Sequence, residues 1–180
     1  VMQLKNIKYN NSIIYVVFTL IFIIGLVVYK DYGLTIDDEI YRKNGELYFE
    51  YIKLLLFTDI PVSIKDLSEK LIGPNNPFAA PILFELPLAF FSFILNKTTT
   101  KEIYTLSHLA NFLIFYKSLF FFYKLVKKEF NSTFYGITSI ILLFFTPRVF
   151  AESFYNSRDI FFLSIFIFYI YSVKIFLEKE

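Results

Sequence analysis

The sequence predicts an all-α integral membrane protein with about four transmembrane helices. Hydrophobic residues make up 56% of the chain and aromatic residues 22%, with 25 phenylalanines, and soluble domains rarely have such a composition. Several uncharged stretches approach the roughly 20 residues that a helix needs to cross about 30 Å of hydrocarbon. Lysines cluster beside several of these stretches, as is typical of the loops of membrane proteins. We therefore expect a single transmembrane domain over residues 1–180.

The first predicted helix covers Ser12 to Tyr29, a stretch without charge. A secretory signal peptide has a shorter apolar core and a cleavage site of small residues. Here bulky residues continue from Ile23 to Tyr29. We therefore predict an uncleaved spanning helix.

Residues 30–102 are predicted to form a first outer loop with interfacial helices. Leu47 to Phe57 mixes apolar residues with spaced charges, which is typical of a helix lying in the interface plane. The turn-rich segments Thr58–Pro61 and Gly73–Pro77 follow and predict breaks in the helical structure.

The apolar stretch from Phe78 to Leu95 is predicted to be re-entrant or interfacial. It contains Pro81, Pro87 and Glu85. Prolines break or kink helices, and a carboxylate is costly in hydrocarbon. Glu85 either contacts a substrate in an outer cavity or shows only that the segment stays near water.

Three further spans are predicted over Ile103–Val126, Phe134–Phe150 and Ile160–Leu177. Short cytoplasmic loops are enriched in lysine. If Phe78–Leu95 does not cross, three lysine groups lie on one side, which favours four crossings and a cytoplasmic N-terminus. Five crossings would place one of these groups, Lys124 with Lys127 and Lys128, on the outer side. The groups are Lys5 and Lys8; Lys124, Lys127 and Lys128; Lys174 and Lys179.

Composition excludes several classes of function. The chain has no cysteine and one histidine, His108, which excludes disulfides, thiolate metal sites and histidine clusters. No cofactor is predicted, and a divalent metal would have only carboxylates to bind it. The net charge of +2 is spread over mixed loops, so the sequence does not predict nucleic-acid binding.

Two acidic and polar clusters flank apolar stretches. Asp37-Asp38-Glu39 follows the first stretch, and Asn156-Ser157-Arg158-Asp159 precedes the last. Carboxylates at the mouths of spanning helices often mark a working site. With four crossings both clusters lie on the outer face, whereas five crossings would separate them.

The residues around these clusters resemble a known family. Tyr32 to Glu39, with Arg42 and Gly45 after it, resembles the opening of C-type membrane glycosyltransferases, most of all the bacterial polyprenyl-phosphate-mannose protein mannosyltransferase-like enzymes. Thr146 to Ile160 is similar to their second signature, a Pro-Arg followed by Asn-x-Lys/Arg-Asp. Ser107 to Asn111 is then expected to open a helix. Because such enzymes run to several hundred residues, the resemblance implies that this chain is an N-terminal fragment.

The resemblance implies sugar transfer, with inversion, at the outer face of the bacterial inner membrane. The donor is a polyprenyl-phosphate-linked sugar, the acceptor is a protein, glycan or lipid, and membrane lipids surround the chain. Asp37 matches the base, and Asp38 takes its place if the match shifts by one. Asp159 matches an aspartate that positions the acceptor or the phosphate.

The chemistry fits these residue types. An acceptor hydroxyl gains from a carboxylate that takes its proton, and a guanidinium stabilises the charge on the leaving phosphate. The carboxylates are Asp37, Asp38 and Asp159. The candidate substrate-binding residues are Glu39, Arg42, His108, Arg148, Asn156 and Arg158.

Each candidate also has a structural interpretation. The first acidic cluster and Asp159 can cap helices or stabilise a helix dipole. Arg148 can anchor a helix end, and His108 can pack at a helix mouth. A non-catalytic membrane subunit or a transporter fragment would explain the helices and aromatic residues equally well, but not the two spaced acidic clusters.

Overall fold

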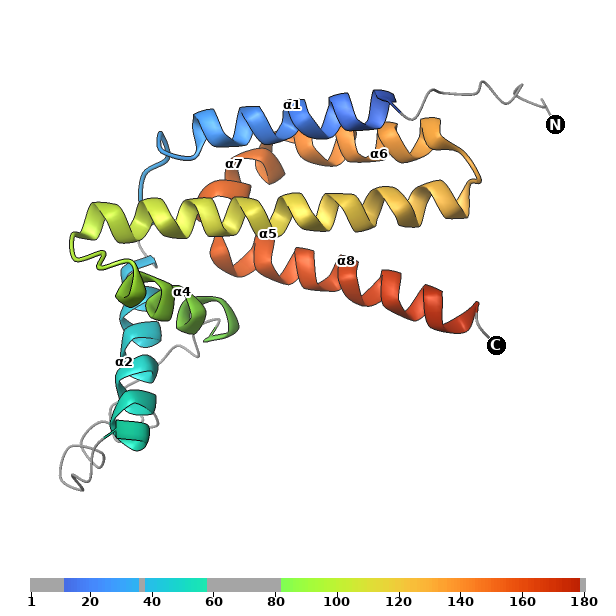
Figure 1. The fold of residues 1–180 in the computed structure, drawn as a ribbon. Helices are drawn as coiled ribbons and strands as arrows, with labels where there is room; N and C mark the ends of the chain where they lie inside the picture. The colour runs from blue at the N-terminus through green and yellow to red at the C-terminus, as the bar shows by residue number, and fades with distance from the viewer. Residues whose placement is uncertain (1–11, 36–37, 58–81, 179–180) are drawn as a thin grey trace. The chain divides into compact units, whose positions relative to one another are not determined.

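A computed structural model describes residues 12–35, 38–57 and 82–178, and all regular structure in them is helical (Figure 1). The prediction of an all-α chain is confirmed. The chain divides into two compact units. The bundle unit comprises the described residues up to Tyr32 and from His108 onward, and the α2–α4 unit comprises those between Gly33 and Ser107. The helices are α1 (Ser12–Val28), α2 (Asp38–Phe57), α4 (Ile82–Ile94), α5 (Thr100–Glu129), α6 (Thr133–Phe145), α7 (Pro147–Tyr155) and α8 (Ser157–Leu177).

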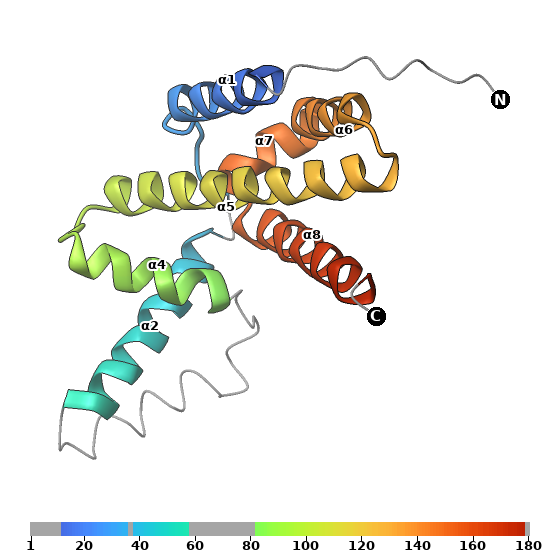
Figure 2. The same cartoon turned by 45° about the vertical axis from the view of Figure 1, so that its right-hand side comes forward.

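Side-chain contacts define how α1, α5 and α8 run relative to one another in the bundle unit (Figures 1 and 2). Phe18 contacts Tyr123 edge-to-face at 6.3 Å, while Gly25, two turns later, faces Phe112. Helix α1 therefore runs antiparallel to α5. Two ion pairs join the C-terminal ends of α5 and α8, which therefore run parallel: Lys128 with Glu178, and Lys174 with Glu129.

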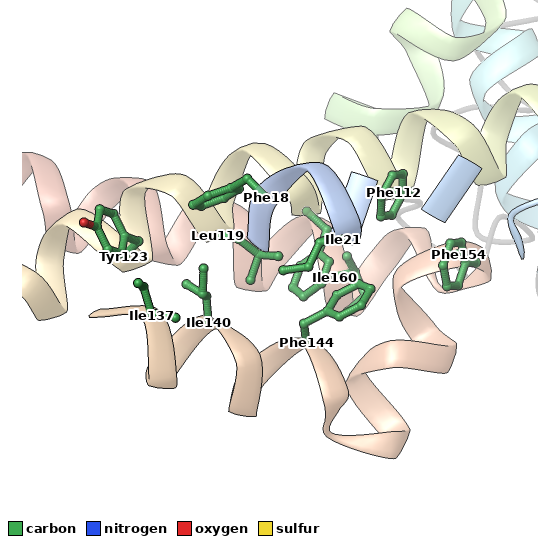
Figure 3. Close-up of a cluster of buried hydrophobic side chains, with 11 residues drawn as sticks. Phe18, Ile21, Phe112, Leu119, Tyr123, Ile137, Ile140, Phe144, Phe154 and Ile160 are labelled. Carbon is green, nitrogen blue, oxygen red and sulfur yellow. The ribbon is translucent and has the colours of Figure 1, made fainter. Parts of the chain in front are cut away.

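Aromatic and branched aliphatic side chains fill the core of the bundle unit (Figure 3). Tyr32 stacks on Phe154 with ring centroids 4.8 Å apart, and Phe154 stacks on Phe112 at 5.4 Å. Stacked rings of this kind contribute beyond the area they bury. The buried core consists of Phe18, Ile21, Phe112, Phe115, Leu119, Tyr123, Ile137, Ile140, Phe144, Phe154 and Ile160.

The outer surface of the bundle unit is also apolar. On α8, the exposed fractions of Phe162, Tyr169 and Phe176 are 71%, 63% and 62%. Exposed rings in such numbers mark a surface that meets lipid or another protein. Helices α5 and α8 are long and apolar enough to cross a membrane, and α6 with α7 adds a third crossing if the bent pair is one span. The chain therefore has the apolar helices of an integral membrane protein.

Two apolar helices are shorter than a usual span. Helix α1 has 17 residues and α4 has 13, which correspond to lengths of about 25 Å and 20 Å against about 30 Å of hydrocarbon. The short α4 agrees with the expectation that this stretch contains a short apolar helix. The count of four crossings stays a prediction.

The predicted span from Phe134 to Phe150 is not one straight helix. Helix α6 ends at Phe145, α7 begins at Pro147, and the two helices meet at 68°. Proline has no N–H and disfavours the helical conformation in the residue before it. Thr146 accordingly has an extended backbone with ψ of 118°. The predicted stretch therefore contains a break, and its crossing as one span stays a prediction.

Two predicted helix starts were wrong. Ser107–Asn111 lies inside α5, which begins at Thr100. The Thr99 hydroxyl accepts the Glu102 N–H at 3.3 Å and Glu102 Oε2 accepts the Thr99 N–H at 3.4 Å, which is a capping box. The predicted interfacial helix over Leu47–Phe57 begins earlier, at Asp38. The breaks at Thr58–Pro61 and Gly73–Pro77, and residues 78–81, lie outside the described residues.

Helix α4 packs along α2 in the α2–α4 unit (Figure 1). A Cβ placed on Gly45 would lie 2.7 Å from Glu85 Cβ and 2.8 Å from the Glu85 carbonyl oxygen. Only glycine allows this close approach of the two backbones. Phe49 packs against Phe93 with ring centroids 5.5 Å apart. Helix α4 continues through Pro87, which shows that this proline does not break it.

Candidate functional site

The first acidic cluster lies at the start of α2. Asp38 Oδ2 accepts the Thr35 N–H at 2.7 Å, as the acid of a capping box does. Glu39 is exposed and pairs with Lys43 at 2.6 Å. The hydrogen bond from Lys43, followed by its charge, lowers the pKa of Glu39. Asp37, the favoured base, lies outside the described residues.

A charged cavity of about 160 Å³ lies in the α2–α4 unit. It has room for several water molecules, and so for a small polar group. Basic, acidic and hydroxyl side chains all line it. The residues are Arg42, Glu46, Phe49, Glu50, Glu85, Leu88, Ala89, Ser92, Phe93, Lys97 and Ile103.

Arg42 connects the first acidic cluster with this cavity. Its guanidinium pairs with Glu46 and lies over the Tyr104 ring, 5.8 Å from the centroid. Burial by itself lowers the pKa of Arg42, but the hydrogen bond with Tyr104 and the attraction of Glu46 outweigh it, so the pKa is raised. Arg42 Nε is buried without a hydrogen-bond partner among the described residues. One donor of this side chain is therefore available to a bound molecule.

Glu85 and Ser92 supply the most buried polar groups of the cavity lining. Their exposed fractions are 5% and 7%, and Ser92 Oγ has no hydrogen-bond partner in the described part of the chain. Burial of a polar atom without a partner costs about 1–3 kcal/mol. Glu85 lines this cavity, and its contact with a substrate stays a prediction. Sequence reasoning missed Glu46, Glu50, Ser92 and Lys97.

The second acidic cluster forms the junction between α7 and α8. Asn156 is the N-cap residue of α8, and its Oδ1 accepts the Asp159 N–H at 3.0 Å. Asn156 Nδ2 donates to Asp159 Oδ2, also at 3.0 Å. The two side chains therefore hold each other at the start of the helix, and the carboxylate lies where the helix dipole favours negative charge. Asp159 is nevertheless exposed.

The remaining predicted residues of the bundle unit lie close to this junction in sequence or on α5. Arg148 Nε donates to Glu152 Oε1 at 2.8 Å, and 81% of the Arg148 side chain is exposed. Arg158 is exposed in the first turn of α8. His108 is buried inside α5, with an exposed fraction of 4%, so it packs within the helix and not at a helix mouth.

Asn111 is a polar residue that sequence reasoning did not select. It is 1% exposed, and its Nδ2 donates to the Glu152 and Ser153 carbonyl oxygens at 3.2 Å and 3.1 Å. These carbonyls belong to the last turn of α7, where the Glu152 carbonyl also accepts the Asn156 N–H at 2.9 Å. Asn111 therefore holds α7 against α5. An asparagine within an apolar helix was the signal in the sequence that could have identified it.

The structure thus brings Asp38, Glu39 and Arg42 together on α2, and Arg148, Asn156 and Asp159 at the α7–α8 junction. The shared outer face of the two clusters stays a prediction. Within residues 12–35, 38–57 and 82–178, no three His, Cys, Asp or Glu side chains are grouped so that they could hold a metal ion. Comparison with known proteins adds no assignment: no family model, curated protein or solved structure matches the chain.

Proposed function

We propose that the chain takes part in transferring a sugar from a polyprenyl-phosphate carrier to an acceptor at the outer membrane face, with an aspartate at the start of α2 as the base. The observation that carries this proposal is the charged cavity beside that helix start. The resemblance of the two acidic clusters to C-type glycosyltransferases supplies the reaction class.

The cavity lining suits a polyhydroxylated ligand. Sugar hydroxyls both donate and accept hydrogen bonds, so they can donate to Glu85 and Glu46 and accept from Arg42 Nε and Lys97. Ser92 Oγ can do either. The volume of about 160 Å³ suits one small ring, and the exposed apolar helices would hold the polyprenyl chain.

The spacing of an aspartate and an arginine on α2 supports the proposal. Asp38 and Arg42 are four residues apart on one helix, so they lie on the same face, one turn from each other. Arg42 lines the cavity. A carboxylate that accepts the acceptor proton and a guanidinium that binds the leaving phosphate need this proximity.

The bundle unit supports the proposed orientation. Lys124, Lys127 and Lys128 lie in the last two turns of α5, and two ion pairs bring Lys174 of α8 to the same end. The α7–α8 junction, with Asp159, lies at the start of α8 and so at the other end. Because lysines favour the cytoplasmic side, we propose four crossings with Asp159 on the outer face.

The test follows the loss of labelled mannose from polyprenyl-phosphate mannose in proteoliposomes that contain the chain, with bacterial membrane extract as the acceptor source. Removal of a general base costs about 10²–10⁴-fold in rate. We expect a loss of this size for Asp37→Asn or Asp38→Asn, and a comparable loss for Arg42→Gln. The exposed Lys43→Gln variant on the same helix is the control and should keep its activity.

Donor turnover unaffected by both aspartate substitutions would refute the base assignment. No turnover by the parent chain would leave the second candidate function, a non-catalytic membrane subunit. That candidate is favoured by the cap hydrogen bonds of Asp38 and Asp159. Asparagine keeps a side-chain acceptor but removes the charge, so Asp38→Asn separates catalysis from capping if the parent chain turns over the donor. A role in capping alone then predicts that the variant keeps the parent's activity and nearly its full stability.

A further inference from the structure

A second cavity, independent of the proposed sugar site, lies in the bundle unit between α1 and α5. It has a volume of about 600 Å³, within the roughly 300–1,000 Å³ of typical small-molecule sites. Tyrosine and phenylalanine rings dominate its lining. The lining residues are Ile14, Tyr15, Phe18, Tyr116, Lys117, Phe120, Tyr123 and Lys127. We refer to this cavity as the α1–α5 groove.

The groove opens onto the apolar outer surface of the bundle unit. Tyr15 and Phe120, which line it, have exposed fractions of 72% and 43%. The outer surface of α5 is also apolar, and α5 is long and apolar enough to cross a membrane. A molecule that enters the groove from the bilayer must therefore have an apolar part that lies against these rings.

The charge of the groove is positive. Of the residues that the structure describes, Lys117 and Lys127 line it and no carboxylate does. Neither lysine forms an ion pair among the described residues, although Lys127 Nζ lies 5.6 Å from the centroid of the Tyr123 ring. Lys117 belongs to the apolar part of α5, where an ammonium group is costly unless an anion or the interface is within reach. The occupant should therefore carry a negative charge.

We propose that the α1–α5 groove binds an anionic phospholipid. Lys127 lies in the last turn of α5, where lysines and tyrosines contact lipid headgroups. Lys117 is ten residues earlier, which is about 15 Å along the helix axis, and its long side chain can extend toward the headgroup. The phosphate binds near Lys127, and one acyl chain lies along Phe120, Tyr116 and Phe18.

The chain offers a direct probe, because it contains no tryptophan. Tyr15→Trp places a single indole in the lining of the groove. Two sets of vesicles contain both phosphatidylcholine and phosphatidylglycerol, with phosphatidylcholine brominated in one set and phosphatidylglycerol in the other. Comparing the quenching of the tryptophan fluorescence in the two sets gives the relative binding constants of the two lipids. One lysine near an anionic headgroup favours it by about fivefold, so we expect phosphatidylglycerol to be preferred by at least this factor.

Lysine substitutions in the Tyr15→Trp chain test whether the two lining lysines cause the preference for phosphatidylglycerol. Lys117→Gln and Lys127→Gln should each reduce the preference, and together they should abolish it. Lys124→Gln is the matched control: it removes the same charge from the same end of α5, but Lys124 lies 4.4 Å from the centroid of the Phe120 ring and outside the lining. The Lys124→Gln variant should keep the full preference for phosphatidylglycerol.

Three results would overturn the proposal. Equal quenching by both brominated lipids would show that the groove does not select an anion. A loss of preference in Lys124→Gln as large as in Lys127→Gln would mean diffuse attraction to the surface. Absence of quenching by either lipid would show that a protein segment covers the groove.

Discussion

Replacement of Gly25 by alanine tests the packing of α1 on α5. Helix propensity alone predicts that this change within a helix stabilises the folded chain by about 0.5–1 kcal/mol. Packing predicts the opposite sign, because the new Cβ would lie 1.9 Å from Phe112 Cζ. Carbon atoms in contact are about 3.5 Å apart or more, so the ring would have to move by about 1.6 Å.

Phe112 has little room for such a movement. Its exposed fraction is 0%, and it stacks on Phe154 at 5.4 Å. Overpacking of a filled core costs about 1–3 kcal/mol, so after the gain in propensity we expect a net loss of about 1–2 kcal/mol. For a chain of this size, that loss lowers Tm by about 2–8 °C.

Thermal unfolding in detergent micelles, followed by circular dichroism, measures the change in Tm. Gly33→Ala is the control, because a Cβ at Gly33 meets no heavy atom within 4 Å; its Tm should match the parent. Adding Phe112→Leu to Gly25→Ala should recover part of the lost stability through coupling of the two sites. A Tm for Gly25→Ala equal to or above that of the parent would refute the packing described for α1 and α5.

Three further outcomes are expected. Gly45→Ala should lower the helix content of the α2–α4 unit in circular dichroism, because the new Cβ would lie 2.7 Å from Glu85 Cβ; unchanged content would contradict this packing. Asn111→Ala should destabilise the chain by about 1–3 kcal/mol in chemical unfolding, since two hydrogen bonds to α7 are lost and the Ser153 carbonyl loses its Asn111 donor, and a neutral effect would contradict that role. In an NMR titration, Lys43→Gln should raise the pKa of Glu39 toward its ordinary value. The Glu39–Lys43 pair stabilises α2 above the ordinary glutamate pKa and stops doing so as the pH falls through the lower folded value.

Hydrophobicity was sufficient to predict where α1 and α8 lie. The predicted stretch Ser12–Tyr29 became α1 over Ser12–Val28, and Ile160–Leu177 became α8 over Ser157–Leu177. An uninterrupted apolar run has few alternatives to a helix. The helix break at Pro147 was harder to predict, because apolar residues continue on both sides of the proline and conceal it.

The candidate site was predictable only in part. The acidic residues of α2 and the α7–α8 junction stand out in the sequence because charges are rare beside apolar stretches. The charged cavity does not, because it depends on which face of α4 meets α2. That pairing is specified by Gly45 against Glu85 and by Phe49 against Phe93, contacts between residues some 40 positions apart that local patterns do not reveal.

The ion pairs between the ends of α5 and α8 constrain how the chain threads a membrane. Lys128 with Glu178 and Lys174 with Glu129 join the two C-terminal ends, so both helices run in one direction. If both cross the bilayer, the segment between them must bring the chain back, and the bent pair α6–α7 is then a complete traverse. Reporter tags in the connection at residues 130–132 and directly after α8 must consequently label the same side of the membrane.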